Sequence, residues 1–122
     1  MVAICSDIDL MSINFLRECH RFLNTREATN MGVGLGLDIA DSLWFFRRPT
    51  VSARECPSYF DDLAGTSRSP YHAELAVYVH TGWIDTLHSY GDFSRGYPRF
   101  TRENALRTVE VMEQANLHFP VW

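Results

Sequence analysis

The fold is decided by the stretch VAICSDID, residues Val2 to Asp9, in which a short apolar run is followed directly by two aspartates. An apolar run of this length that ends in acids is typical of a buried strand. Ser12 is then placed to cap a helix whose apolar residues recur at helical spacing. These residues are Phe15, Leu16, Cys19, Phe22 and Leu23. The stretch therefore predicts a strand followed by a helix.

The next segments are predicted from apolar patterning and from glycine and proline. Segment 32–39 alternates with period two and segment 43–46 is densely apolar, so both are expected to be extended or to form a hairpin. The glycines in 32–36 lack the GxGxxG spacing, which favours close backbone packing over a phosphate-binding loop. Segment 47–70 shows no sustained periodicity and is predicted to be a long loop.

Regular patterning returns in the second half of the chain. The spacing predicts a helix over 71–81 that ends at Gly82, followed by a strand over 83–88 and a loop over 89–99. Thr101 is expected to cap the last helix. The predicted apolar face of that helix consists of Ala105, Leu106, Val109, Met112 and Ala115. A final strand is predicted to open at 117–122.

Strands that alternate with helices predict an α/β fold with right-handed crossovers and a largely parallel sheet. Because the last predicted strand continues to Trp122, we expect a partial (β/α) barrel that lacks its C-terminal units. Residues 1–122 then form a single incomplete (β/α)-barrel-like domain that contains the 47–70 loop.

The composition excludes several classes of function. All eleven basic side chains are arginines, so Schiff-base chemistry and a P-loop lysine are ruled out. The net charge of -4 and the scattered arginines argue against nucleic acid or an anionic membrane as a partner. The three cysteines, Cys5, Cys19 and Cys56, are expected to be reduced thiols, two of them in the core. With no visible signal peptide, this predicts a cytoplasmic location.

Polar residues follow two of the predicted strands. Asp7 and Asp9 end the first strand, His88 ends the strand over 83–88, and Asp92 lies in the loop that follows it. Because ligands bind at the carboxyl ends of parallel strands, these four side chains are expected to cluster at one edge of the sheet. Carboxylates and an imidazole can hold a divalent cation, zinc or another transition metal, and a spare carboxylate can act as general base.

The motifs SDID, residues 6–9, and LHSYGD, residues 87–92, resemble those of the NodB-homology polysaccharide deacetylases. The resemblance implies a distorted (β/α) barrel and metal-assisted removal of acetyl groups from a sugar. It implies that Asp7 is the base and that Asp9 and His88 are metal ligands, with Asp92 in place of the second histidine of the family motif. The aspartates of that family are commonly adjacent, whereas Ile8 separates them here, so their roles are open. Motifs found later in the family are missing, which predicts little activity for this chain alone.

Two other functions fit parts of the sequence. Asp7-Ile8-Asp9 resembles the Asp-x-Asp motif of haloacid-dehalogenase-like phosphohydrolases, and Asp61-Asp62 resembles their later acidic pair. The missing lysine and the unexplained His88 count against this alternative. A non-catalytic carbohydrate-binding or structural role is the other alternative, because the chain is rich in aromatic residues. Trp44 and Tyr90, the latter predicted in a loop beside His88, are the candidate sugar-binding residues. The sequence leaves the oligomeric state open.

Overall fold

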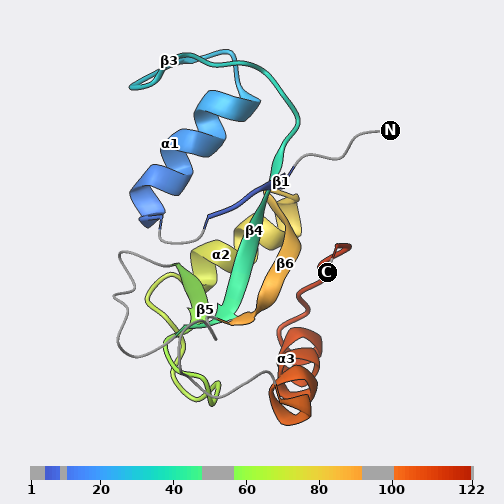
Figure 1. Ribbon diagram of the computed structural model, residues 1–122. Helices are drawn as coiled ribbons and strands as arrows, with labels where there is room; N and C mark the ends of the chain where they lie inside the picture. Colours follow the sequence, from blue (N-terminus) through green and yellow to red (C-terminus); the bar gives the residue numbers. More distant parts are fainter. Residues whose placement is uncertain (1–4, 9–10, 48–56, 92–100, 122) are drawn as a thin grey trace.

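A computed structural model describes residues 5–8, 11–47, 57–91 and 101–121 of the chain (Figure 1). It has a parallel sheet, a small separate hairpin and three helices. In chain order the elements are β1 (Cys5–Ser6), α1 (Ile13–Asn24), β2 (Ala28–Thr29), β3 (Gly32–Val33), β4 (Ala40–Phe46), β5 (Ser58–Phe60), α2 (His72–Thr81), β6 (Ile84–Gly91) and α3 (Arg102–Gln114). The predicted α/β fold is confirmed.

The strand β4 is the centre of the sheet and pairs in parallel with β1, β5 and β6. Because β6 pairs with β4 from Asp41 to Phe46, β1 and β5 share the opposite edge of β4. Val121 forms a parallel bridge with Thr86 of β6. The parallel sheet expected from the sequence is therefore confirmed, and it is not closed into a barrel within the described ranges.

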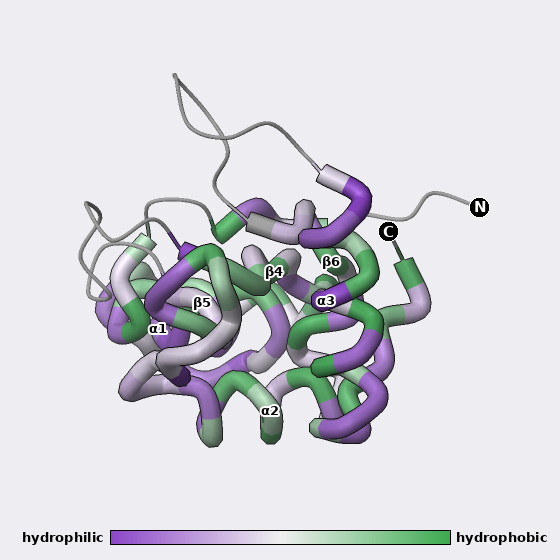
Figure 2. Tube along the Cα trace, turned by 90° about the horizontal axis from the view of Figure 1, so that it is seen from below, coloured by the Kyte–Doolittle hydropathy of each residue, from purple (hydrophilic) through white to green (hydrophobic). Residues whose placement is uncertain are grey.

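The hydrophobic core lies between the sheet and the helices. Figure 2 shows α2 against one face of the strands, and α2 contacts both β5 and β6. The fully buried side chains at the centre include Leu16, Leu43, Phe45, Phe46, Leu75, Ile84 and Phe119. Burial of a large apolar side chain contributes about 1.5–3 kcal/mol relative to leaving it exposed, so these side chains dominate the stability of the sheet.

The predicted ends of the helices are confirmed by their caps. The backbone N–H of Phe15 donates to Ser12 Oγ at 3.2 Å, and that of Asn104 donates to Thr101 Oγ1 at 3.2 Å. Gly82 follows α2 with φ of 79°, in the left-handed region where glycine avoids the steric cost of a side chain. No described helix is long and apolar enough to cross a lipid bilayer.

The predicted apolar faces of α1 and α3 are confirmed only in part: Leu16 and Met112 are buried as predicted, but other members of each face are not. Phe15 is 50% exposed and Leu106 is 52% exposed, whereas His20 and Thr108 are buried. Both buried polar side chains have internal hydrogen-bond partners: His20 contacts Asp41, and Thr108 Oγ1 donates to the carbonyl of Asn104. A hydropathy pattern assigns polar residues such as these to the surface, because it contains no information about hydrogen bonds that allow a polar side chain to be buried.

Segments 32–39 and 43–46 do not form the predicted hairpin with one another. Strand β3 pairs antiparallel with β2, whereas segment 43–46 belongs to the parallel strand β4. The backbone after β3 lies against the end of α1: the N–H of Leu35 donates to Phe22 O at 2.7 Å and that of Leu37 to Leu23 O at 2.8 Å. These bonds satisfy carbonyls that the end of a helix otherwise leaves without a partner.

Gly34 permits this close approach. A Cβ at Gly34 would lie 2.3 Å from the carbonyl oxygen of Thr25, so a side chain does not fit. The prediction that the glycines of 32–36 serve close backbone packing is confirmed at this position.

Three further boundaries differ from the sequence-based prediction. Segment 47–70 contains the buried strand β5, so it is not a loop throughout. Strand β6 continues to Gly91, which places Tyr90 in a strand and not in a loop. The predicted strand at 117–122 is reduced to the isolated bridge at Val121. Strand β6 extends past residue 88 because its pairing with β4 continues as far as Phe46 and Gly91, beyond two irregularities in the register.

Candidate functional site

Asp7, Trp44 and His88 come together from three neighbouring strands. His88 Nδ1 lies 4.0 Å from Asp7 Oδ1, and the imidazole centroid lies 5.8 Å from the ring centroid of Trp44. The side chains of Asp7 and His88 are 59% and 38% exposed, so a ligand can reach both. The expected convergence of the first and later polar motifs therefore holds for Asp7 and His88.

A shift in strand register sets the position of His88. Leu43 pairs with Leu87, and the next residue of β4, Trp44, pairs with Ser89. His88 is thus the extra residue on β6 at a bulge-like irregularity. Bulges leave one residue outside the ladder and redirect its side chain, and they are common beside active sites. The bulge accounts for the way a histidine on β6 approaches an aspartate that follows β1.

The position of Asp7 follows from the shortness of β1. Ser6 pairs with Asp41, near the start of β4, and Asp7 is the first residue after the strand. Asp7 therefore lies level with the beginning of β4, well before β4 itself ends. The sequence analysis assumed that the strands end side by side at one edge of the sheet. In the structure β1 ends near the beginning of β4, so the carboxyl ends of these two strands do not lie side by side.

The other candidate residues are distributed differently. Asp9 and Asp92 lie outside the described residues. Tyr90 is partly buried and packs against the hydrophobic core, while Trp44 is partly exposed and stays beside His88. Within the described ranges, no three His, Cys, Asp or Glu side chains form a group able to hold a metal ion. Among the candidate residues, the structure therefore brings together Asp7, His88 and Trp44.

The thiol of Cys5 lies next to this site. The expectation that two cysteines are in the core is not met for Cys5, which is exposed, or for Cys19, which is only partly buried. Partial desolvation and the nearby carboxylates of Asp85 and Asp41 raise the pKa of the Cys5 thiol, against a lowering hydrogen bond with Thr86. A thiol with a raised pKa is a poor nucleophile at neutral pH, so Cys5 does not fit a catalytic role.

A buried polar cluster that the sequence did not reveal lies where α1 packs on β4. His20 Nδ1 is 3.0 Å from Asp41 Oδ2, and the two side chains are only 7% and 2% exposed. Asn24 extends the cluster through hydrogen bonds with both backbone groups of Ile39, at 2.6 and 2.9 Å. The spacing of four between His20 and Asn24 places them on one helix face and is the sequence signal that could have identified them.

Aromatic stacking continues this cluster toward α2. The ring of Trp83 is stacked on the rings of His20 and Tyr78. The distances between the ring centroids are 3.8 Å to His20 and 4.8 Å to Tyr78. The hydroxyl of Tyr78 donates to Glu74, which also accepts two hydrogen bonds from Arg17, each of 2.7 Å. Partial burial, followed by the hydrogen bond to Glu74, raises the pKa of Tyr78. This chain of contacts joins α1, α2 and β4, and it contains none of the residues of the Asp7–His88 site.

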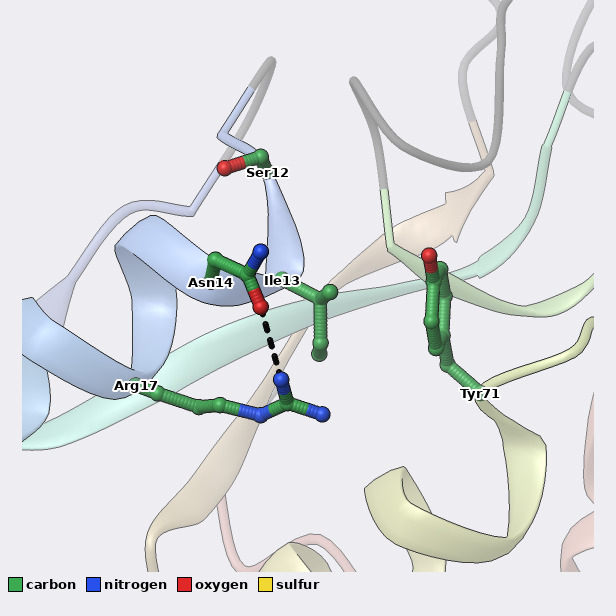
Figure 3. Close-up of a pocket in the computed structure, with 5 residues that line it drawn as sticks. All are labelled: Ser12, Ile13, Asn14, Arg17 and Tyr71. Carbon is green, nitrogen blue, oxygen red and sulfur yellow. Dashed lines mark hydrogen bonds between the residues drawn. The ribbon is translucent and has the colours of Figure 1, made fainter.

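A surface pocket opens beside the start of α1 (Figure 3). It has a volume of about 430 Å³ and is lined by Ser12, Ile13, Asn14, Arg17 and Tyr71. The guanidinium of Arg17 is directed to Asn14 Oδ1, at 2.7 Å, and to Glu74. Arg17 is held by these partners, and no candidate catalytic residue lines the pocket. We therefore assign the pocket no part in the candidate site.

The acidic pair of the alternative phosphohydrolase has structural partners. Asp61 Oδ1 lies 2.7 Å from a guanidinium nitrogen of the buried Arg47. Asp62 accepts hydrogen bonds from the backbone N–H groups of Thr66 and Ser67. Both aspartates therefore stabilise the segment after β5.

Comparison of the chain with protein-family models, with characterised proteins and with solved structures gives no match.

Proposed function

We propose that the chain is an incomplete part of a metal-dependent hydrolase that resembles the polysaccharide deacetylases and removes acetyl groups from a sugar, with little activity on its own. The observation that carries the proposal is the approach of Asp7 and His88 to 4.0 Å, from motifs that lie far apart in the sequence. The parallel pairing of β1, β4 and β6 and the parallel bridge at Val121 support a partial (β/α) barrel, although β5 pairs on the β1 side of β4 and so departs from the simple chain order.

The donor set fits a divalent cation. Imidazole nitrogens and carboxylate oxygens both bind zinc at roughly 2 Å. His88 Nδ1 and Asp7 Oδ1 are 4.0 Å apart, so an ion held by His88 would have the carboxylate of Asp7 within reach of the ion or of its bound water. His88 is the proposed ligand among the described residues, and the sequence adds Asp9 and Asp92. Such a cation would polarise the acyl carbonyl and lower the pKa of a bound water.

Asp7 is proposed as the general base. Its side chain is 59% exposed, which lets the carboxylate take a proton from a water that attacks the acyl carbon. The bond between the acyl carbon and the sugar nitrogen or oxygen then breaks, and the products are acetate and a sugar amine or hydroxyl. Trp44 lies beside His88 and offers its indole as a surface for the sugar ring.

Metal titration tests the proposal. We expect Zn²⁺ to raise the midpoint of thermal unfolding and Co²⁺ to give a visible absorption band in the wild type. Both effects are expected to disappear in His88→Ala and to persist in the matched control His118→Ala, because His118 is exposed and lies outside the site. Persistence of both effects in His88→Ala would overturn the assignment of the ligand.

The role of Asp7 is tested by acetate release from an acetylated chito-oligosaccharide. Asp7→Asn is expected to bind Co²⁺ with an unchanged spectrum while any acetate release falls by about 100-fold or more, the usual contribution of a general base. A requirement for Mg²⁺ together with an aspartyl-phosphate trapped on Asp7 would instead identify a phosphohydrolase.

A further inference from the structure

Another pocket lies between α3 and the segment that follows β5. Its volume is about 120 Å³, and the buried side chains of Phe60 and Val111 form its apolar side. The long polar side chains that line it are those of Arg68, Arg107 and Gln114. All three can donate hydrogen bonds, and no acidic residue lines the pocket within the described ranges. The pocket is therefore open to solvent, polar on one side and suited to an acceptor of hydrogen bonds.

The pocket lies at the carboxyl ends of two parallel strands. Phe60, the last residue of β5, pairs with Phe46, the last residue of β4. Gly65, which lines the pocket, lies against the same end of β4, because a Cβ added there would be 3.0 Å from Phe46 Cε1. In parallel α/β sheets, ligands bind outside the carboxyl ends of the strands. The position of the pocket in the fold is thus that of a ligand site.

The backbone of Arg68 is fixed, whereas its guanidinium has no partner among the described residues. Arg68 forms an antiparallel bridge with Phe60, and the N–H of Asp61 donates to Ser67 O at 2.8 Å beside it. The side chain of Arg68 is exposed, and no described residue forms an ion pair or a hydrogen bond with its guanidinium. Arg68 therefore presents an unneutralised positive charge at a fixed place on the rim of the pocket.

Arg107 is held only weakly on the opposite side. Its guanidinium contacts Glu110 at 3.4 Å and the carbonyl oxygen of Gly65 at 3.5 Å, both longer than the usual distance of about 2.7–3.2 Å. In contrast, Arg17 makes hydrogen bonds of 2.7 Å at the pocket beside α1. The contact with Glu110 is exposed, and exposed ion pairs contribute little. Arg107 can therefore turn toward a ligand at small cost.

The nearest acid of the segment after β5 does not compete for Arg68. Asp62 accepts hydrogen bonds from the backbone N–H groups of Thr66 and Ser67 and from the Thr66 hydroxyl. Its carboxylate is thus directed to its own turn and forms no ion pair with Arg68 in the described part of the chain.

We propose that this pocket binds the phosphate group of a small molecule between the guanidinium groups of Arg68 and Arg107. A guanidinium matches phosphate oxygens with two parallel hydrogen bonds. A phosphate monoester carries about -1.5 to -2 charges at pH 7, which two arginines balance more fully than they would the single charge of a carboxylate. The volume of about 120 Å³ is several times the roughly 10–15 Å³ that one water requires, so a phosphate group has room.

This site does not depend on the function proposed for Asp7 and His88. None of the candidate residues of that site lines the pocket. The pocket lies beside β5, whereas His88 belongs to β6, and these strands pair with opposite edges of β4.

Titration with inorganic phosphate, followed by ¹⁵N-correlated NMR of the full chain, tests the site. At constant ionic strength, phosphate is expected to shift the Nε–H signals of Arg68 and Arg107 and the amide signal of Gly65 in a saturable way. Acetate is expected to bind at least several-fold more weakly, because it carries one charge. Glucose 6-phosphate is the second probe: tighter binding than inorganic phosphate identifies a phosphorylated small molecule as the ligand, and equal binding identifies free phosphate.

Variants then measure the contribution of the arginines. Arg68→Gln is expected to weaken phosphate binding by roughly 10-fold or more, the range for hydrogen bonds to charged groups. Arg102→Gln is the matched control, since Arg102 is exposed, begins α3 and does not line the pocket. It removes the same charge and is expected to keep the affinity of the wild type. Gln114→Glu leaves both arginines in place and adds a carboxylate to the exposed rim, so it is also expected to weaken binding.

Three results would overturn the site: no saturable shift with either phosphate probe, equal affinity for acetate and phosphate, or the same affinity in Arg68→Gln and Arg102→Gln. These measurements use neither Zn²⁺ nor acetate release. Failure of the phosphate site would therefore leave the proposed hydrolase untouched, and failure of the hydrolase would leave the phosphate site untouched.

Discussion

The imidazole of His20 lies 3.0 Å from the carboxylate of Asp41, and both side chains are almost completely buried. The contact between His20 and Asp41 joins α1 to the start of β4. Asp41 is also the residue of β4 that pairs with Ser6 of β1 in the sheet. Asp7 follows directly after that pair of residues. The His20–Asp41 contact therefore stabilises the part of the sheet from which the candidate site extends.

Loss of Asp41 is expected to destabilise the protein strongly. Asp41→Ala removes the carboxylate that lies 3.0 Å from the buried His20, and the loss of a hydrogen-bond partner of a buried polar group costs about 1–3 kcal/mol. Asp41→Asn keeps an acceptor and is expected to cost less. Urea denaturation measures the free energy of unfolding, with the exposed Asp38→Ala as control. Equal values for Asp41→Ala and Asp38→Ala would show that the pair contributes nothing to stability.

Gly34→Ala is expected to separate segment 34–37 from the end of α1. The new Cβ would lie 2.3 Å from Thr25 O, so the backbone has to move, at a cost of about 1–3 kcal/mol. The amide protons of Leu35 and Leu37 are expected to exchange faster with solvent, because their hydrogen bonds to α1 are lost. Gly82→Ala is a suitable control, since open space surrounds Gly82 and only its left-handed φ is strained. Unchanged protection of the two amides in Gly34→Ala would contradict the close packing.

The Arg17–Glu74 contact is expected to make stability depend on pH. Hydrogen bonds from Arg17 lower the pKa of Glu74 below its ordinary value of 4.5, although partial burial raises it. Because the folded-state pKa is the lower one, the stabilisation is complete above the unfolded-state pKa and disappears as pH falls through the folded-state pKa. The contact is partly exposed, so Glu74→Gln is expected to cost about 0.5–1 kcal/mol at pH 7.

Unfolding of the wild type and of Glu74→Gln at pH 7 and below pH 4 measures this contribution, and the difference between them is expected to shrink at the lower pH. Glu113→Gln in α3 is the control, because Glu113 is exposed. A wild-type advantage that is the same at both pH values would show that the charge of Glu74 is not its source.

Local signals in the sequence predict the helix caps and the alternation of strands and helices. The cap residues form hydrogen bonds with residues within one helical turn, so a short stretch of sequence is enough to predict them. These residues are Ser12, Gly82 and Thr101. The position of His88 cannot be predicted from a short stretch of sequence, because the bulge arises where β6 pairs with β4, a strand that lies about forty residues earlier in the chain. The same holds for His20, whose burial depends on Asp41 in another element.

The convergence of Asp7 with His88 was predictable only in outline. The rule that ligands gather at the carboxyl ends of parallel strands selects both residues. It does not give the stagger of the strands, since the shortness of β1 depends on β5 occupying the rest of the same edge of β4. Trp44 was selected for its aromatic ring, whereas its position beside His88 emerges only from the packed structure.

Asp62 is expected to hold the turn after β5 in place. Its carboxylate accepts from the N–H of Thr66 at 3.1 Å and of Ser67 at 2.5 Å, and from the Thr66 hydroxyl at 3.0 Å. Partial burial raises the pKa of Asp62, but these hydrogen bonds together lower it below its ordinary value of 3.8. The turn is therefore expected to be fully stabilised above that value and to loosen as pH falls through the folded-state pKa.

Asp62→Ala is expected to cost about 1.5–3 kcal/mol, the range for hydrogen bonds to a charged group, and to speed amide exchange at Thr66 and Ser67. Asp62→Asn keeps one acceptor oxygen and is expected to retain part of the protection. Asp38→Asn is the matched control, since Asp38 is exposed and lies before β4. If exchange at Thr66 and Ser67 is as slow in Asp62→Ala as in the wild type, the turn is held by its backbone and by the neighbouring β5, and the carboxylate is dispensable.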